Sequence, residues 1–120
     1  MSNKRVDLLT TAECRELLDR HHFGRLGLMN YVGVFPSIIP VNYLLDEDKI
    51  VIRTDAGSKL NAALRGAPVA FEVDGVDETC QVGWSVVVRG HAEEVTDEDK
   101  LAELRQTFEL VGLTVNDVSL

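Results

Sequence analysis

The chain has 120 residues, a formal net charge of −8, and 45% hydrophobic residues. This composition is typical of one folded domain over residues 1–120 and excludes a disordered or low-complexity chain. The acidic charge argues against nucleic acid as a partner, because phosphate-backbone binding needs a basic face. No apolar run approaches the roughly 20 residues of a membrane helix. Two cysteines, Cys14 and Cys80, and no secretory signal favour a cytoplasmic protein without a membrane partner.

The N-terminal part predicts a helix over residues 11–21. Thr10 and Glu13 are three residues apart, as in a capping box that begins a helix. Apolar residues then recur at helical spacing. Gly24 ends this pattern, so His21 and His22 are expected near the C-terminal end of the helix.

The middle of the chain mainly predicts strands. Pro36 and Pro40 lack the N–H that a strand ladder needs, so the long strand that contains them has an open edge or a bulge. Gly90 indicates a bulge or kink in the last strand, and the acidic stretch 74–81 is expected to be a loop. The expected strands cover residues 26–29, 34–45, 50–54, 69–73 and 84–91, with 92–95 as an extension.

Two further helices are expected. Ser58 caps a short helix over residues 59–65, which Gly66 closes. An apolar stripe at spacings of three and four predicts a C-terminal helix over about residues 97–111. Five or six strands with three peripheral helices indicate an α+β, mainly β domain built on a small antiparallel barrel, with its core in residues 9–95.

A candidate phosphate site lies where the strand 50–54 leads into the short helix. Arg53 and Lys59 supply positive charge, and Thr54 and Ser58 supply hydroxyl groups around a loop that contains a glycine. Free N–H groups at the start of a helix also favour an anion. The alternative is an ordinary capped helix with solvated charges. Residues 50–71 hold three bases and one acid, whereas residues 93–120 carry a net charge of −6.

Two strands hold candidate positions for a planar ligand. Pro40 opens the ladder, so that backbone groups near Val41 and Asn42 are free to bond a ring. The alternative is a strand buried on both faces, with Asn42 bonded inside. Trp84, followed by Ser85, is either an aromatic wall beside a ring or an anchor in the core.

The histidines and cysteines do not predict a metal site. His21 and His22 are adjacent, so on a helix they point about 100° apart. His91 is distant in sequence, and the cysteines lack the spacing of zinc ligands. No side chain stands out as a catalytic acid or base, and the catalytic residues stay unknown.

Five short motifs follow one another along the chain, at residues 24–28, 39–43, 53–60, 68–74 and 83–90. Together, in this order, they resemble the pyridoxamine 5′-phosphate oxidase-like family of FMN-binding split barrels. The resemblance is strongest to the short bacterial branch that includes nitroimidazole-resistance-type proteins. It covers residues 9–95 and implies a six-stranded antiparallel split β-barrel of Greek-key type, a homodimer, and FMN in a cleft between subunits. Some relatives bind the deazaflavin F420 or haem instead.

The resemblance also implies three groups of cofactor-binding residues. One group binds the phosphate, a second runs beside the isoalloxazine ring, and a third, contributed by the partner subunit, completes the cleft. These groups are Arg53, Thr54, Ser58 and Lys59 for the phosphate, Pro40, Val41 and Asn42 for the ring, and Trp84 and Ser85 for the completing strand.

Two departures from the family disfavour pyridoxamine phosphate itself as the substrate. Residues 34–45 contain no lysine or arginine, and the acidic C-terminal region is expected to lack the closing strand and basic motif of the better-known oxidases. We therefore expect an FMN-dependent oxidoreductase acting on another small molecule. The alternatives are a flavin- or haem-binding carrier or sensor without turnover, an F420-dependent reductase, and a dimeric barrel with an empty cleft.

Overall fold

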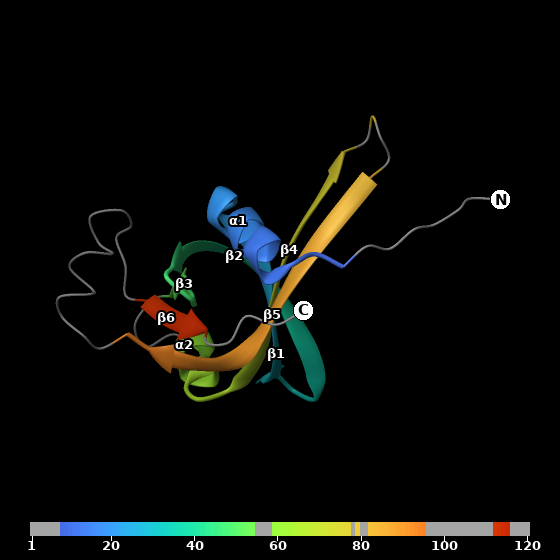
Figure 1. Ribbon diagram of the computed structural model, residues 1–120. Helices are drawn as coiled ribbons and strands as arrows, with labels where there is room; N and C mark the ends of the chain where they lie inside the picture. Colours follow the sequence, from blue (N-terminus) through green and yellow to red (C-terminus); the bar gives the residue numbers. More distant parts are fainter. Residues whose placement is uncertain (1–7, 55–58, 78, 80–81, 96–111, 116–120) are drawn as a thin grey trace.

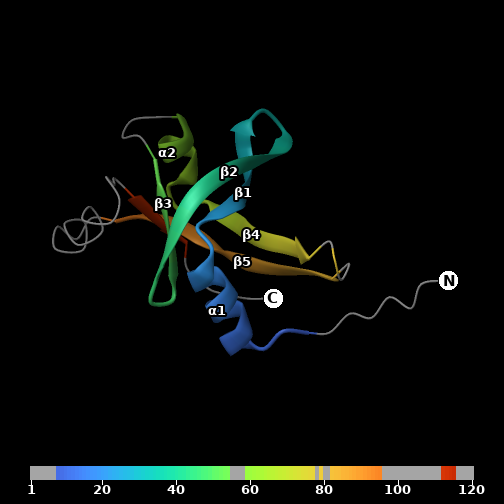
Figure 2. The same ribbon diagram turned by 90° about the horizontal axis from the view of Figure 1, so that it is seen from above.

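The computed structural model describes residues 8–54, 59–77, 79, 82–95 and 112–115 (Figure 1). The predicted C-terminal helix and Ser58 lie outside these residues. Figures 1 and 2 show α1 and α2 at opposite ends of a curved sheet. The elements are α1 (Thr11–Arg20), β1 (Phe23–Val32), β2 (Phe35–Asp46), β3 (Lys49–Arg53), α2 (Lys59–Leu64), β4 (Pro68–Asp77), β5 (Val82–Glu94) and β6 (Gly112–Val115).

The strands pair antiparallel, in the order β1-β2-β3-β6-β5-β4, and β1 also pairs with β4 to close the ring. This arrangement confirms the predicted mainly β, antiparallel domain with peripheral helices and is consistent with a split barrel. The expectation that the closing strand is absent is wrong, because β6 pairs with both β3 and β5. A strand of four residues shows too few alternations to stand out in an acidic segment.

Helix α1 begins at the predicted capping box. The Glu13 N–H donates to Thr10 Oγ1 at 3.1 Å, and the Thr10 N–H donates to Glu13 Oε1 at 3.0 Å. These hydrogen bonds lower the pKa of the Glu13 carboxyl. The helix buries Leu18, and the buried Tyr43 hydroxyl donates to the Leu18 carbonyl at 2.6 Å. This bond fixes the C-terminal turn of α1 to β2.

The β4–β5 hairpin is longer than predicted. Asp74 and its neighbours belong to β4, which runs to Asp77, so a loop over residues 74–81 is wrong. Glu72 and Asp74 alternate with the buried Phe71 and Val73, and their charge hid this strand alternation. The register is also unbroken at Gly90, where a bulge was predicted.

The core is apolar and lies inside the curved sheet. Tyr43 and Phe71 meet edge to face there, with ring centroids 4.8 Å apart. Burial raises the pKa of the Tyr43 hydroxyl, so it stays a hydrogen-bond donor. No helix in the described part of the chain has the length and apolar character to cross a membrane. The largest fully buried side chains are Tyr43, Phe71, Leu18, Leu26, Ile50, Ile52 and Leu64.

Candidate functional site

The first half of β2 has an open edge. Residues 37–42 pair with β1, whereas pairing with β3 covers only residues 43–46. In the described residues no strand pairs with the other edge of residues 35–42. Asn42 is exposed, so the alternative of a strand buried on both faces is wrong. The open edge of β2, as we call this stretch, is where proline was predicted to interrupt a ladder.

Backbone alternation shows which groups face the open edge. The Tyr43 N–H donates to the His22 carbonyl at 2.9 Å, toward the β1 side. Because antiparallel residues alternate between the two edges, the backbone of Val41 also faces β1, and its side chain is buried. The N–H and C=O of Asn42 and the C=O of Pro40 therefore face the open edge. Both Pro36 and Pro40 place their missing N–H there, which is where a strand tolerates proline.

The predicted phosphate residues begin where this edge opens. Tyr43 pairs with Ile52, so one further step of the same register would set Asn42 opposite Arg53. β3 ends at Arg53, and the chain leaves the sheet there. The open edge of β2 and the Arg53–Thr54 end of β3 are therefore adjacent, although they are more than ten residues apart in sequence.

Thr54 and Lys59 differ in their surroundings. Thr54 is buried, and its hydroxyl donates to Asn61 Oδ1 at 3.4 Å. This bond ties α2 to the end of β3. Lys59 is the first residue of α2 and is exposed, as is Arg53. The two cations flank residues 55–58, and the phosphate role of all four residues, Ser58 included, stays a prediction.

Trp84 and Ser85 lie elsewhere in the same protomer. They belong to β5, which is separated from β2 by β1 and β4. Three strand spacings amount to about 14 Å. Trp84 is half-buried and its ring lies 5.0 Å from the ring of His21, at the end of α1. In one protomer the Arg53–Thr54 end of β3 therefore lies beside Pro40–Asn42, whereas Trp84 and Ser85 lie three strands away.

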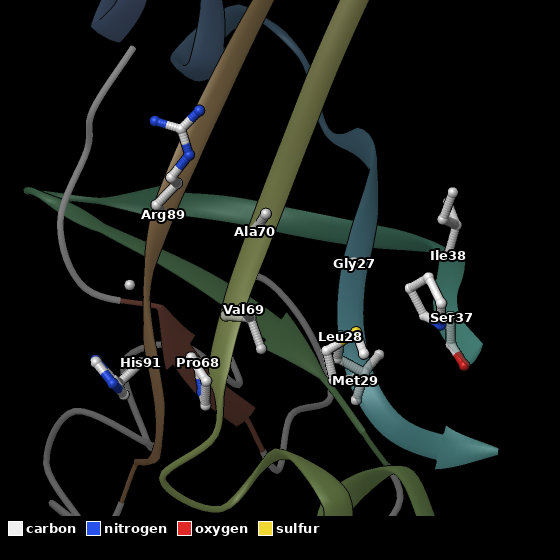
Figure 3. Close-up of a pocket in the computed structure, with 12 residues that line it drawn as sticks. Gly27, Leu28, Met29, Ser37, Ile38, Pro68, Val69, Ala70, Arg89 and His91 are labelled. Carbon is white, nitrogen blue, oxygen red and sulfur yellow. The ribbon is translucent and has the colours of Figure 1, made fainter. Parts of the chain in front are cut away.

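A groove that the sequence analysis missed crosses the outer face of the sheet β2-β1-β4-β5. Its cavity volume is about 640 Å³. Gly27 and Ala70 form the floor, Ile38 stands on one side, and Arg89 and His91 stand on the other (Figure 3). Ile38, Gly27, Ala70 and Arg89 are partners across the four strands. Only the pairing of β1 with β4 brings the small residues Gly27 and Ala70 side by side, so no local sequence signal reveals the groove.

Charged residues continue this outer face beside the groove. Arg25 Nη1 donates to Glu72 Oε1 at 3.3 Å and to Asp74 Oδ2 at 3.2 Å. Burial raises the pKa of the Glu72 carboxyl, and the neighbouring Asp74 raises it further, against the opposite effect of Arg25. The acids of β4 thus lie beside the groove and are paired with Arg25 of β1, while Arg89 and His91 of β5 line the far side of the groove.

We expect Glu72 to make stability depend on pH. A carboxyl whose pKa is higher in the folded state than in the unfolded state holds its proton more tightly when the protein is folded. Its contribution to folding stability is therefore complete at a pH below the unfolded-state pKa, and it is lost as the pH rises through the folded-state pKa. From about pH 4.5 upward, the melting temperature of the wild type should fall relative to Glu72→Gln. Glu16→Gln, an exposed carboxyl on α1, is the control. If the melting temperatures of the wild type and Glu72→Gln differ by the same amount at pH 4.5 and at pH 7, the expectation is contradicted.

Metal ligands do not gather in the described residues. No group of three His, Cys, Asp or Glu residues there is arranged to hold an ion. His21 faces the ring of Trp84, and His22 lies 6.4 Å from the ring of Tyr43.

Comparison with known proteins shows which sequences this chain is similar to. A sequence model of pyridoxamine 5′-phosphate oxidase matches residues 10–114. The uncharacterised protein Rv0080 of Mycobacterium tuberculosis is 34% identical over 110 residues, which are 88% of this chain and 71% of that protein.

Solved structures share the fold. The FAD binding protein of Mycobacterium smegmatis is 35% identical, with a TM-score of 0.78 over 95% of this chain and 93% of that one. An FAD and haem binding protein of the same organism has a TM-score of 0.72 at 20% identity, over 92% of this chain and 67% of that one, which is a likeness of fold alone. The match over residues 10–114 shows that this chain belongs to the pyridoxamine 5′-phosphate oxidase family.

Proposed function

We propose that this protein binds FMN at the open edge of β2 and acts as an oxidoreductase on a small molecule. The observation behind the proposal is the adjacency of that edge to the exposed cation Arg53, at the end of β3. The Mycobacterium smegmatis relative that is 35% identical is an FAD binding protein. FAD contains the ring and 5′-phosphate of FMN, so the two share the chemistry that this edge would recognise.

The open edge fits the polar side of an isoalloxazine ring. A flavin carries one N–H and two carbonyl groups on its pyrimidine ring. The N–H needs a hydrogen-bond acceptor from the protein, and the carbonyl groups need hydrogen-bond donors. The Asn42 N–H and C=O and the Pro40 C=O face this edge. Bound flavin supplies the hydride chemistry, while the protein binds and orients it.

Two cations suit the phosphate. Arg53 and Lys59 are exposed on either side of residues 55–58, and Lys59 opens α2. Charge-assisted hydrogen bonds to phosphate are stronger than neutral ones. The Thr54 hydroxyl donates to Asn61, so its first role is to hold α2 beside the end of β3. Ser58 completes the set that we propose.

We further propose that the functional unit is a homodimer of six-stranded Greek-key split barrels. Trp84 and Ser85 are three strands from the open edge of their own protomer, so a second copy is needed to bring them to it. The outer face is suited to a second copy because most of the residues that line its groove are apolar, and a second copy would remove them from water. Ile38 is 74% exposed on this face.

The interface can be tested with one substitution. Ile38→Glu places a charge in an apolar contact and is expected to shift the protein from dimer toward monomer in light scattering. Leu8→Glu is the control, because Leu8 is 88% exposed near the N-terminus. This variant should keep the molecular mass that light scattering gives for the wild type. A wild-type protein that is monomeric at micromolar concentration refutes the dimer.

Cofactor choice is tested by spectra of the purified protein with FMN, FAD, F420 and haem in turn. FMN should bind tightest and show a shifted absorption band, with FAD as the next ligand. Preference for F420 or haem would overturn FMN and support the alternatives of an F420-dependent reductase or a haem carrier. Absence of binding to all four supports a dimeric barrel with an empty cleft.

Turnover is tested separately. The reduced holoprotein is mixed with a panel of small oxidants in a stopped-flow instrument. Re-oxidation faster than that of free FMN supports an oxidoreductase. Rates equal to free FMN across the panel favour a flavin carrier or sensor.

A further inference from the structure

The ring of Trp84 lies close to the ring of His21 and to the backbone of Gly75. The ring centroids of Trp84 and His21 are 5.0 Å apart, and the planes are tilted by 43°, which is within the range of favourable ring pairs. Gly75 is the cross-strand partner of Trp84. A β-carbon on Gly75 would lie only 2.7 Å from the indole Nε1. The indole therefore lies across the backbone of Gly75, with His21 beside it.

This contact joins the β4–β5 hairpin to α1. β4 pairs with β1 as far as Glu72. Beyond Glu72, in the described residues, β4 pairs with β5 alone. His21 is presented from a fixed position, because the Tyr43 hydroxyl holds the carbonyl of Leu18 in the last turn of α1. The part of the β4–β5 hairpin beyond Glu72 thus contacts the C-terminal end of α1 through the rings of Trp84 and His21.

We propose that His21 is a positioning residue for Trp84. It holds the indole against Gly75 and so orients the aromatic wall that Trp84 offers to the flavin cleft of a second copy. The flavin part of this inference rests on the proposed function.

Charged and titratable residues also lie beside this contact in the described part of the chain. Asp19 and Arg20 precede His21 on α1, and His22 follows it, with its ring toward Tyr43 on β2. On β4, Asp74 is bonded to Arg25 on the outer face. Gly83 and Ser85, which flank Trp84 on β5, are uncharged.

The contact has a specific spectroscopic signature, because Trp84 is the only tryptophan of the chain. A protonated imidazole quenches a neighbouring indole. The fluorescence of the ligand-free wild type should therefore fall as pH is lowered from roughly 8 to 5, the range in which histidine changes charge. His21→Gln should abolish this transition, and His22→Gln should retain it.

Gly75 provides an independent check of this contact. Gly75→Ala should displace the indole and also abolish the transition. Gly83→Ala is the matched control, since a β-carbon there would lie 3.5 Å from the Gly75 carbonyl oxygen, in ordinary contact. A transition that persists in His21→Gln, or that survives Gly75→Ala unchanged, overturns the contact.

The flavin readout tests the positioning role. His21→Gln should weaken FMN binding by about two- to five-fold, the size of one exposed contact of this kind. His21→Phe keeps a ring beside Trp84 without the proton, so it should keep FMN affinity and lose the pH transition. Unchanged FMN affinity in His21→Gln overturns the positioning role. If the wild type binds no FMN while the pH transition is intact, the proposed function fails and the role in flavin binding fails with it, whereas the ring contact itself is upheld.

Discussion

Replacing Lys59 with alanine is expected to weaken FMN binding by about 10- to 150-fold. A charge-assisted hydrogen bond contributes about 1.5–3 kcal/mol, and Lys59 is the exposed cation that opens α2 beside residues 55–58. Alanine is the best helix former, so α2 itself should persist. The measurement is a titration of the ligand-free variant with FMN, followed by absorption.

Two further variants make this result specific. Lys49→Ala removes an exposed lysine at the start of β3 and should leave FMN affinity unchanged. Lys59→Arg keeps the positive charge and should retain most of the affinity. If Lys59→Ala binds FMN as tightly as Lys49→Ala does, Lys59 does not contact the phosphate.

Replacing Gly24 with alanine is expected to destabilise the fold by about 1–3 kcal/mol, the usual cost of overpacking a core. A β-carbon on Gly24 would lie 2.6 Å from Phe71 Cζ and 2.7 Å from the Glu72 carbonyl oxygen. Phe71 is fully buried, and the Glu72 oxygen is backbone, so neither can move away freely. Urea unfolding should show a lower midpoint with an unchanged slope.

The matched control lies in the same strand. A β-carbon on Gly27 would be 3.6 Å from the Ala70 carbonyl oxygen, an ordinary contact distance, so Gly27→Ala should change the stability much less. Equal unfolding midpoints for Gly24→Ala and Gly27→Ala would show that the space over Phe71 is not as tight as the structure indicates.

Local patterns predicted several elements accurately. The capping box at Thr10 placed the start of α1, and Pro36 and Pro40 placed the open edge of β2, because both signals act through backbone groups close to the residues themselves. The β4–β5 hairpin was less well predicted, since Glu72 and Asp74 resemble loop residues when only their charge is considered. They face outward from a strand and alternate with Phe71 and Val73.

The residues of the candidate site could be predicted from the sequence, but their arrangement in space could not. Arg53, Lys59 and the Pro40–Asn42 stretch could be named from motifs, because each is a short run with its own chemistry. The adjacency of Arg53 to the Pro40–Asn42 stretch depends on the β2–β3 register, which pairs Tyr43 with Ile52. The groove floored by Gly27 and Ala70 had no local signal at all.

The amino-acid sequence by itself determined the acidic charge, most strand and helix positions, the open edge and the family, because these depend on composition, periodicity and short motifs. Only the tertiary structure decided that Thr54 is buried against Asn61, that Trp84 lies on Gly75 beside His21, and that Trp84 is three strands from the open edge of its own protomer. These are contacts between distant segments, and they follow from how the strands pair.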